Sequence, residues 1–369
     1  MNPADHFSAD YPEARGKFCA AARQAGAALE RLSNPNLGPD GGDISTDIAW
    51  FGPTDAPSVL VLLSGTHGVE GFCGSGAQVD WMARGEAGRL PDGVAALLVH
   101  AINPYGFAWL RRVTEENVDL NRNWVDFEGP LPDNAGYLDI HDALCPRDWD
   151  EAARSRGGAL LAGYAAKEGY PAFVAAATGG QYARDDGIFF GGAGETWARR
   201  TQTQILGHYL RAARDVAIID FHTGIGPWGH GERMSPASRS TLEFKRAAEW
   251  YGAAVTSLPD GSSSSAVIRG DGLSGAIALL PHARTTPMAL EFGTRPGGEV
   301  LDALRADNWL HRWGDPLGPQ AKSIKATIRD AFYGDTDDWK GMVAGQSLLA
   351  CRQAVAGLAA ALACGSAVK

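Results

Sequence analysis

Several features that would mark a membrane, secreted or nucleotide-binding protein are missing from this sequence. The apolar runs fall short of the roughly 18 residues that a membrane-spanning helix needs, so we expect no membrane span. Residues 1–6 hold no basic stretch followed by an apolar core, which argues against a signal peptide. No G-x-x-x-x-G-K-S/T motif occurs, so the glycine-rich stretches do not predict a P-loop.

Cysteine is scarce as well, and basic residues are outnumbered. The five cysteines (Cys19, Cys73, Cys145, Cys351 and Cys364) are scattered and form no C-x-x-C pair, so a reduced cytoplasmic protein is the simplest interpretation. Asp and Glu number 43 against 33 Lys and Arg, which gives a formal net charge of -10. Nucleic-acid binding usually requires a basic patch, so we expect no nucleic acid as a partner. The lack of a long apolar run likewise gives no reason to expect a membrane as a partner.

The length and composition are those of an ordinary globular protein. With 369 residues, of which 45% are hydrophobic and 21% charged, the chain could form one large domain or two medium ones. Because it has no internal repeat and no convincing linker, we expect a single catalytic domain over residues 1–369. Nothing in the sequence predicts the oligomeric state.

Short apolar runs alternate with helical segments along the chain. Strands are predicted at 59–63, 94–102, 216–221 and 288–292, with an edge strand near 44–51. Strands separated by helices are typical of an α/β fold, so we expect a three-layer α/β/α architecture with a mixed, largely parallel central sheet.

An N-terminal helix is predicted at about 12–33 and a helical C-terminal segment at about 298–362. The other predicted helices are at about 71–87, 148–178, 195–214 and 242–251. Loops of the length of 104–140 are uncommon without a function, so a functional loop region is expected there. A second loop is expected at 223–240. Residues 179–194 are rich in glycine and aromatics, and form either a pocket wall or a packed surface loop.

Two strand ends carry candidate metal ligands. His67-x-x-Glu70 lies in a glycine-rich turn after the 59–63 strand, and His222 follows the 216–221 strand. A lone His-x-x-Glu is common at surfaces, but side chains at the carboxyl ends of parallel strands meet in the crevice where α/β folds bind ligands. Two His and one Glu, with one position open, form a catalytic zinc set. The sequence therefore predicts one Zn2+ per chain, although this set would accept other divalent metals.

Two acidic residues could support this site. Asp220 lies on the same strand face as His222 and could accept a hydrogen bond from that ligand. Glu291 interrupts the apolar run 288–292, and a buried carboxylate is costly unless it is paired or near a metal. It is therefore either bonded to a neighbouring loop or a general base beside the metal.

A charged segment at 111–124 holds three arginines. It could be a salt-bridged surface loop, but Arg122 lies between Asn121 and Asn123 and suits a fixed guanidinium. Arginine binds carboxylates in bidentate fashion, and a second arginine near a metal could stabilise an oxyanion.

These segments together resemble the zinc carboxypeptidase superfamily. The resemblance rests on His67-x-x-Glu70, on residues 103–106 (NPYG) and 118–124 (VDLNRNW), and on His222 and Glu291. The amino-acid sequences of residues 64–71 and 221–227 are similar to those of a bacterial subgroup described as a domain of unknown function. That subgroup is related to the succinylglutamate desuccinylase/aspartoacylase branch.

The resemblance implies a carboxypeptidase-like fold and specific roles for individual residues. His67, Glu70 and His222 would be the zinc ligands, and Glu291 the general base. The resemblance assigns the binding of the substrate's carboxylate to Asn121 and Arg122.

One role in the resemblance has two candidates. Arg112 would be the oxyanion arginine, with Arg111 as its rival. The family's mobile tyrosine that caps the substrate has no clear counterpart; Tyr182 and Tyr251 are the candidates.

The function implied is that of a metallopeptidase: a zinc-dependent hydrolase that cleaves an amide or peptide bond next to a free carboxylate. A small peptide or an N-acyl amino acid is the expected substrate. Two alternatives stay open. One is an N-acyl amino acid deacylase of the aspartoacylase/desuccinylase type, and the other is a non-catalytic carboxylate-binding protein on the same scaffold.

Overall fold

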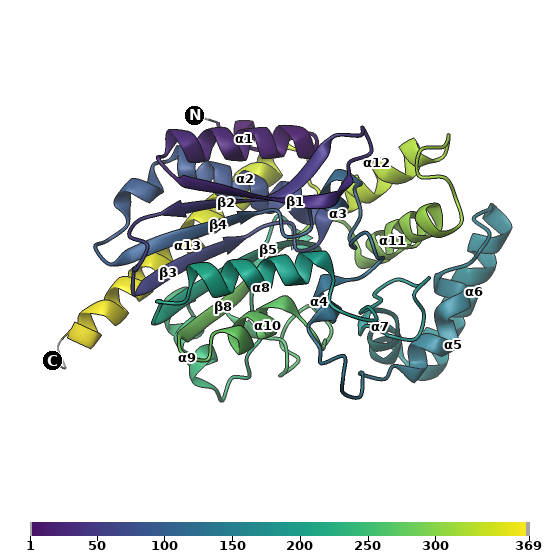
Figure 1. Ribbon diagram of the computed structural model, residues 1–369. Coiled ribbons are helices and arrows are strands. Elements are labelled where there is room, and N and C mark those ends of the chain that lie inside the picture. Colours follow the sequence, from purple (N-terminus) through teal and green to yellow (C-terminus); the bar gives the residue numbers. More distant parts are fainter. Residues whose placement is uncertain (1, 367–369) are drawn as a thin grey trace.

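An eight-stranded mixed sheet with helices on both faces forms the centre of the protein (Figure 1). The computed structural model describes residues 2–366. The strands are β1 (Ala28–Leu37), β2 (Asp43–Phe51), β3 (Ser58–Leu63), β4 (Val94–His100), β5 (Asp215–Trp228), β6 (Gly231–Ser235), β7 (Thr256–Ser257) and β8 (Arg284–Gly293). Their order in the sheet is β1-β2-β4-β3-β5-β8-β6-β7. The central strands β4, β3, β5 and β8 are parallel, which confirms the predicted fold class.

Thirteen α-helices and three short 3-10 helices connect these strands within the described residues. The α-helices are α1 (Tyr11–Gln24), α2 (Gly71–Ala83), α3 (Pro104–Ala108), α4 (Leu120–Asn123), α5 (Ala135–Leu144), α6 (Glu151–Glu168), α7 (Tyr170–Thr178), α8 (Trp197–Tyr209), α9 (Leu242–Tyr251), α10 (Gly272–Leu279), α11 (Gly297–Arg312), α12 (Ala321–Phe332) and α13 (Asp337–Ser366). The 3-10 helices are η1 (Pro3–His6), η2 (Gly68–Glu70) and η3 (Glu86–Arg89).

Each face of the sheet packs on its own layer of helices. Side chains alternate across a strand, so Leu60 and Leu62 of β3 join one apolar cluster with α1, α2 and α13. Val59 and Val61 join a second cluster with α8 and α10 on the opposite face. Because both faces are covered, β3 is buried along its whole length, as expected for a strand inside a parallel sheet.

A third group of helices forms one end of the molecule, at the right in Figure 1. It contains α5, α6, α7, α11 and α12, and its apolar cluster includes Tyr137, Phe189, Leu304 and Ile328. Helices α7 and α11 also line the main cavity, so this group closes one side of the candidate site.

The predicted N-terminal helix at 12–33 is too long. Helix α1 ends at Gln24, and Gly26 with φ +80 turns the chain into β1, which pairs antiparallel with β2. Strand β1 is therefore the edge strand, and the predicted edge strand near 44–51 lies inside the sheet. Pro35 is tolerated in β1 because it lies at the edge, where the register shifts between Ser33 and Leu37.

Other differences lie in the loops. The region 104–140 contains two short helices, α3 and α4, and the start of α5. The predicted loop 223–240 instead carries the end of β5 and all of β6, which pairs with β8. Strand β7 and helix α10 were not predicted, because both are short. The serine-rich and glycine-rich segment 261–272 begins shortly after β7 and ends at the start of α10.

The C-terminal helix α13 packs against α2, β3 and β5 through Trp339, Val343, Ala350 and Leu358, which are fully buried. By length and composition alone, this is also the one helix among residues 2–366 that could cross a membrane. The absence of a membrane span therefore stays a prediction. The single domain over residues 1–369 also stays a prediction.

The turn after β3 depends on close backbone contact. A Cβ atom added to Gly68 would lie 2.0 Å from the carbonyl carbon of Gly106, so only glycine fits at the first residue of η2, directly after His67. Gly68 N donates to Arg112 O and Val69 N donates to Arg111 O, at 3.1 and 2.8 Å. The turn that carries His67 and Glu70 is thereby fixed to the loop that carries Arg112.

We therefore expect Gly68→Ala to destabilise the protein by about 1–3 kcal/mol, since the backbone must move to admit the methyl group. Urea denaturation measures this change. Gly88→Ala in η3 is the matched control, because its added Cβ would meet no atom within 4 Å. Equal stability of the two variants would contradict the proposed close contact.

Candidate active site

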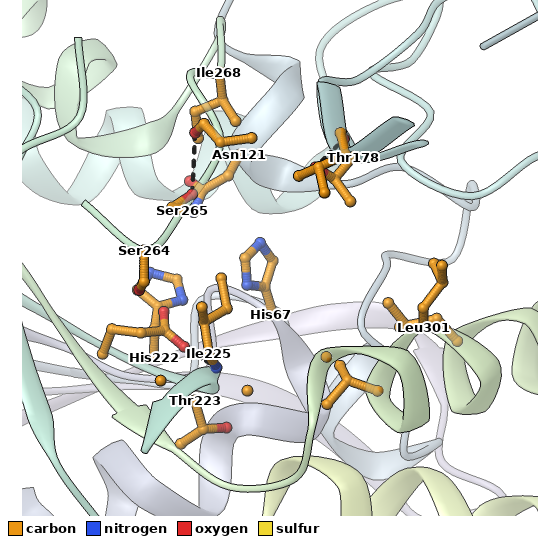
Figure 2. A pocket seen from close by; sticks show the side chains of 18 of the residues that line it. His67, Asn121, Thr178, His222, Thr223, Ile225, Ser264, Ser265, Ile268 and Leu301 are labelled. Atoms are coloured by element: carbon orange, nitrogen blue, oxygen red, sulfur yellow. Dashed lines mark hydrogen bonds between the residues drawn. The ribbon is translucent and has the colours of Figure 1, made fainter. Parts of the chain in front are cut away.

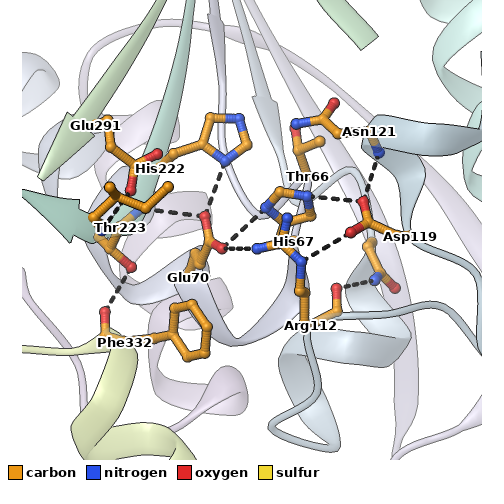
Figure 3. A network of polar contacts seen from close by, with 12 residues as sticks. Thr66, His67, Glu70, Arg112, Asp119, Asn121, His222, Thr223, Glu291 and Phe332 are labelled. Carbon is orange, nitrogen blue, oxygen red and sulfur yellow. Dashed lines mark hydrogen bonds and ion pairs between the residues drawn. The ribbon is translucent and has the colours of Figure 1, made fainter. Parts of the chain in front are cut away.

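The three predicted metal ligands converge just beyond the carboxyl end of β3, with His222 contributed from within β5 (Figure 3). Glu70 lies between the two imidazoles: its Oε1 is 2.9 Å from His67 Nδ1 and its Oε2 is 2.9 Å from His222 Nδ1. All three side chains are buried, and their candidate ligand atoms lie within 4.8 Å of one another. The structure thus brings together one carboxylate and two Nδ1 atoms.

The far side of each imidazole faces a second carboxylate. His67 Nε2 is 3.2 Å from Asp119 Oδ1, and His222 Nε2 is 2.9 Å from Asp220 Oδ2. Each ring therefore has a carboxylate at both nitrogens; with a metal at Nδ1, Nε2 would stay protonated and donate to Asp119 or Asp220. Asp220 lies as predicted. The contact between Asp119 and His67 was not predicted from the sequence, although a histidine that binds a metal commonly has a carboxylate as hydrogen-bond acceptor at its other nitrogen.

The donor set fits a cation. Four buried carboxylates, those of Glu70, Asp119, Asp220 and Glu291, lie within the site or against its imidazoles. Burial raises the pKa of Glu70, but the charges of both histidines and their hydrogen bonds outweigh it and lower that pKa well below its usual range. Two nitrogen ligands and one carboxylate suit Zn2+, with one position open to a substrate.

Glu291 lines the same cavity as the candidate metal ligands His67 and His222. On adjacent parallel strands it pairs in register with His222, and its Oε1 accepts a hydrogen bond of 3.1 Å from Ile225 N. Burial raises the pKa of Glu291 to about 8, and the charge of Glu70 adds to this shift. A cation held by the three candidate ligands would lower this pKa again, which a proton acceptor at neutral pH requires.

The structure separates the two candidate oxyanion arginines. Arg112 lines the cavity, donating from Nη1 to Glu70 Oε1 and from Nε to Asp119 Oδ2, both at 2.9 Å. Arg111 does not line the cavity and pairs with Asp307 on α11. Of these two arginines, only Arg112 is therefore placed to touch a substrate.

Asn121 and Arg122 also line the cavity. Asn121 Oδ1 accepts a 2.9 Å hydrogen bond from Gly272 N, at the start of α10. Arg122 donates to the carbonyl oxygens of Asn121 and Thr178, while its buried Nε has no partner among residues 2–366. Burial lowers the pKa of Arg122, so its positive charge is incompletely compensated and an anion there would be favoured.

Of residues 179–194, for which a pocket wall and a packed surface loop were both possible, only Phe189 lines the cavity. The Phe189 ring lines the cavity with the guanidinium carbons of Arg112 and Arg122 at 5.4 and 5.6 Å from its centroid, within cation–π range. Phe189 has φ +55, a costly conformation that is typical of functional sites. Sequence reasoning missed this residue. The two tyrosines considered as caps, Tyr182 and Tyr251, do not line the cavity.

The cavity has a volume of about 710 Å3 and extends to both sides of the imidazoles. Figure 2 shows Thr178 and Leu301 on one side of His67, with Ser264 and Ser265 on the other. The α10 side is lined by apolar residues of the second cluster, namely Met234, Leu258, Leu273 and Ala289. The opposite side is lined by α7 and α11.

A buried ion network supports the loop that carries Arg112. Asp307 of α11 accepts from Arg111 Nε at 3.0 Å and pairs with Lys325 of α12. Lys325 Nζ lies 2.7 Å from His311 Nε2. Burial, together with the charge of Arg111, lowers the pKa of His311 to about 3, so this histidine is neutral at pH 7.

The fold and the cluster define this chain as an α/β protein with a candidate metal site at the carboxyl ends of its parallel strands. The model of the family described as "Protein of unknown function (DUF2817)" matches residues 7–346, so the chain belongs to that family. Among curated proteins none matches it.

Several solved structures are similar to the chain. Carboxypeptidase A from Helicoverpa armigera shares 11% identity over 88% of this chain and 74% of its own, with a TM-score of 0.45. Bovine thrombin-activatable fibrinolysis inhibitor shares 8% identity over 96% and 98%, with a TM-score of 0.48. The succinylglutamate desuccinylase from Chromobacterium violaceum shares 14% identity over 86% and 73%, with a TM-score of 0.36.

Replacing Asp220 by Asn should weaken Zn2+ binding by about 10–100-fold, because His222 loses the carboxylate that orients its ring. Competition with a chromogenic chelator measures this affinity. Asp215→Asn is the matched control: it lies on the same strand and pairs with Arg284, remote from the cluster. Wild-type affinity in Asp220→Asn would show that this carboxylate does not orient the ligand.

The buried His311 predicts a pH dependence of stability. Its folded pKa is depressed, so the unfolded state binds more protons below about pH 6.5, and acid should destabilise the wild type there. His311→Gln should remove up to about 1 kcal/mol per pH unit of that loss. Denaturant titrations at pH 7 and pH 5 test this. Identical pH slopes in both proteins would refute the assignment.

Proposed function

We propose that this protein is a zinc-dependent hydrolase that cleaves an amide or peptide bond next to a free carboxylate. The observation that carries the proposal is the register of two neighbouring parallel strands, which places the candidate base Glu291 beside the candidate ligand His222. Both side chains line a cavity that also contains Arg112 and Arg122. Small peptides and N-acyl amino acids are the substrates that this arrangement suits.

Each group in the cavity has a distinct task in this proposal. Zn2+ held by His67, Glu70 and His222 would supply Lewis-acid polarisation of the scissile carbonyl and would acidify water in the site. Glu291 would take a proton from the attacking water and deliver it to the leaving amine. Arg112 would balance the negative charge that develops on the carbonyl oxygen.

Substrate orientation would come from Asn121 and Arg122. The buried Nε of Arg122 has no partner in the described part of the chain, and the guanidinium carbon lies 5.6 Å from the centroid of the Phe189 ring. A carboxylate bound there would fix the distance between the scissile bond and Glu291. Fixing the reactants in this way converts a bimolecular encounter into a step within one complex.

Glu291→Gln should lower kcat by about 10²–10⁴-fold while the fold and the zinc content stay unchanged, because the amide cannot accept the proton. The assay is hydrolysis of N-acyl amino acids and N-blocked dipeptides, with Zn2+ and with a chelator. Glu249→Gln on the exposed side of α9 is the control and should keep full activity.

Substantial activity in Glu291→Gln or in metal-stripped protein would contradict the mechanism. Substrates whose free carboxylate is replaced by a carboxamide should be poor, because Arg122 would then lack its anion. Turnover of N-acyl amino acids without peptides would indicate a deacylase. Binding of these compounds without turnover would indicate a non-catalytic carboxylate-binding protein.

A further inference from the structure

The chain between β7 and α10 forms part of the cavity surface. We name residues 263–269 the β7–α10 segment. In Figure 2, Ser264 lies on the same side of His67 as His222. The segment lines the cavity with the side chains of Ser264, Ser265, Ala266 and Ile268. It therefore belongs to the surface that a substrate in the cavity would contact.

Both ends of this segment are held by neighbouring backbone. Before it, Ser257 N donates to Ser262 Oγ at 2.8 Å, and Ser262 N donates to Ser257 O at 3.2 Å. After it, Gly270 O accepts a 3.0 Å hydrogen bond from Trp124 N. A Cβ atom added to Gly270 would lie 2.7 Å from Arg122 O, so the chain passes close to α4 there. Between these two fixed points, other contacts must hold the segment.

One carboxylate supplies those contacts. Glu232 of β6 accepts two hydrogen bonds from Ser264, one from its backbone N at 3.2 Å and one from its Oγ at 2.5 Å. It also accepts a 2.6 Å hydrogen bond from Thr256 Oγ1. The other hydrogen bonds of the segment stay inside it, such as the one from Ser265 N to Ser263 Oγ. Among residues 2–366, Glu232 is therefore the only hydrogen-bond partner that the segment has outside itself.

The sheet places Glu232 next to the candidate base. Glu232 pairs with Glu291 on the antiparallel neighbour β8, and Met234 pairs with Ala289. Paired residues share a face of the sheet and every second residue returns to it, so these four side chains lie on one face. Three of them line the cavity, whereas Glu232 does not, and its carboxylate is bonded to the β7–α10 segment instead. A shift of the segment would therefore change the cavity near Glu291.

We propose that Glu232 is a positioning residue, which holds the β7–α10 segment in place and so fixes one side of the substrate-binding cavity. This inference rests on the proposed function, because it takes the cavity to bind the substrate. Glu232 does not line the cavity, so it acts through Ser264 and not by contact with the substrate. Loss of this anchor should weaken substrate binding and leave the reacting groups in place.

Limited digestion with trypsin, with the cut sites identified by mass spectrometry, measures the anchor without turnover. Arg269 is exposed within the segment. Cleavage after Arg269 should be at least about tenfold faster in Glu232→Ala than in the wild type, because it follows the population of the released segment. Glu232→Gln should stay within about threefold of the wild type, since its amide can still accept from Ser264 N and donate to Ser264 Oγ.

Two further variants complete the digestion experiment. Ser264→Ala keeps the backbone bond to Glu232 and should give an intermediate rate, which tests the anchor even if Glu232→Ala does not fold. Asp260→Ala is the matched control and should leave cleavage after Arg269 unchanged. Asp260 accepts from Ser238 Oγ at 2.9 Å and from Arg239 N at 2.7 Å, so it holds a different segment in the same way, and it does not line the cavity.

The kinetics of hydrolysis show whether the anchor matters to the substrate. In Glu232→Ala, KM for N-acyl amino acids should rise about tenfold while kcat changes less than about threefold, because binding is lost but Glu291 and the candidate zinc ligands stay in place. Glu232→Gln should restore the KM of the wild type, and Asp260→Ala should keep both constants.

The outcomes separate the two proposals. Hydrolysis by the wild type, combined with unchanged cleavage after Arg269 or an unchanged KM in Glu232→Ala, would overturn the role of Glu232 and leave the hydrolase standing. Faster cleavage in Glu232→Ala that Glu232→Gln reverses, without hydrolysis by the wild type, would support the anchor and overturn the hydrolase.

Discussion

The carboxylate of Glu70 is the interaction on which the rest of the site depends. It contacts both imidazoles, Arg112 and the backbone N of Thr223, so it joins the turn after β3, the loop after α3 and the end of β5. A buried carboxylate is costly without positive charge around it. The charges in this cluster therefore compensate one another, and its candidate ligand atoms lie close enough together to share a cation.

The sheet supplies the geometry that this cluster needs. Parallel strands β3, β5 and β8 end at the same edge, which brings together residues far apart in the sequence, such as Glu70, His222 and Glu291. The helices at one end of the molecule then add the cavity wall and the ion network behind Arg112. Strands thus place the reacting groups, whereas helices and loops shape the space around them.

Much of this arrangement could be predicted from the sequence, and the rest could not for physical reasons. Strands and ligands carry local signals: an apolar run followed by a glycine-rich turn predicts both β3 and His67. Asp119 has no such signal, because its contact with His67 depends on the tertiary fold. The same holds for Phe189, whose left-handed backbone and position between two arginines depend on residues distant in sequence. The N-terminal helix was predicted too long because the register with β2, which defines β1, is a non-local property.

The central claim is that His67, Glu70 and His222 hold one catalytic zinc ion. X-ray absorption at the zinc edge, combined with elemental analysis of the purified protein, tests it most directly. The account predicts one zinc per chain, with two imidazole nitrogens and carboxylate oxygen in its first shell. Protein that binds no divalent metal at this stoichiometry, or zinc whose first shell lacks imidazole, would contradict it.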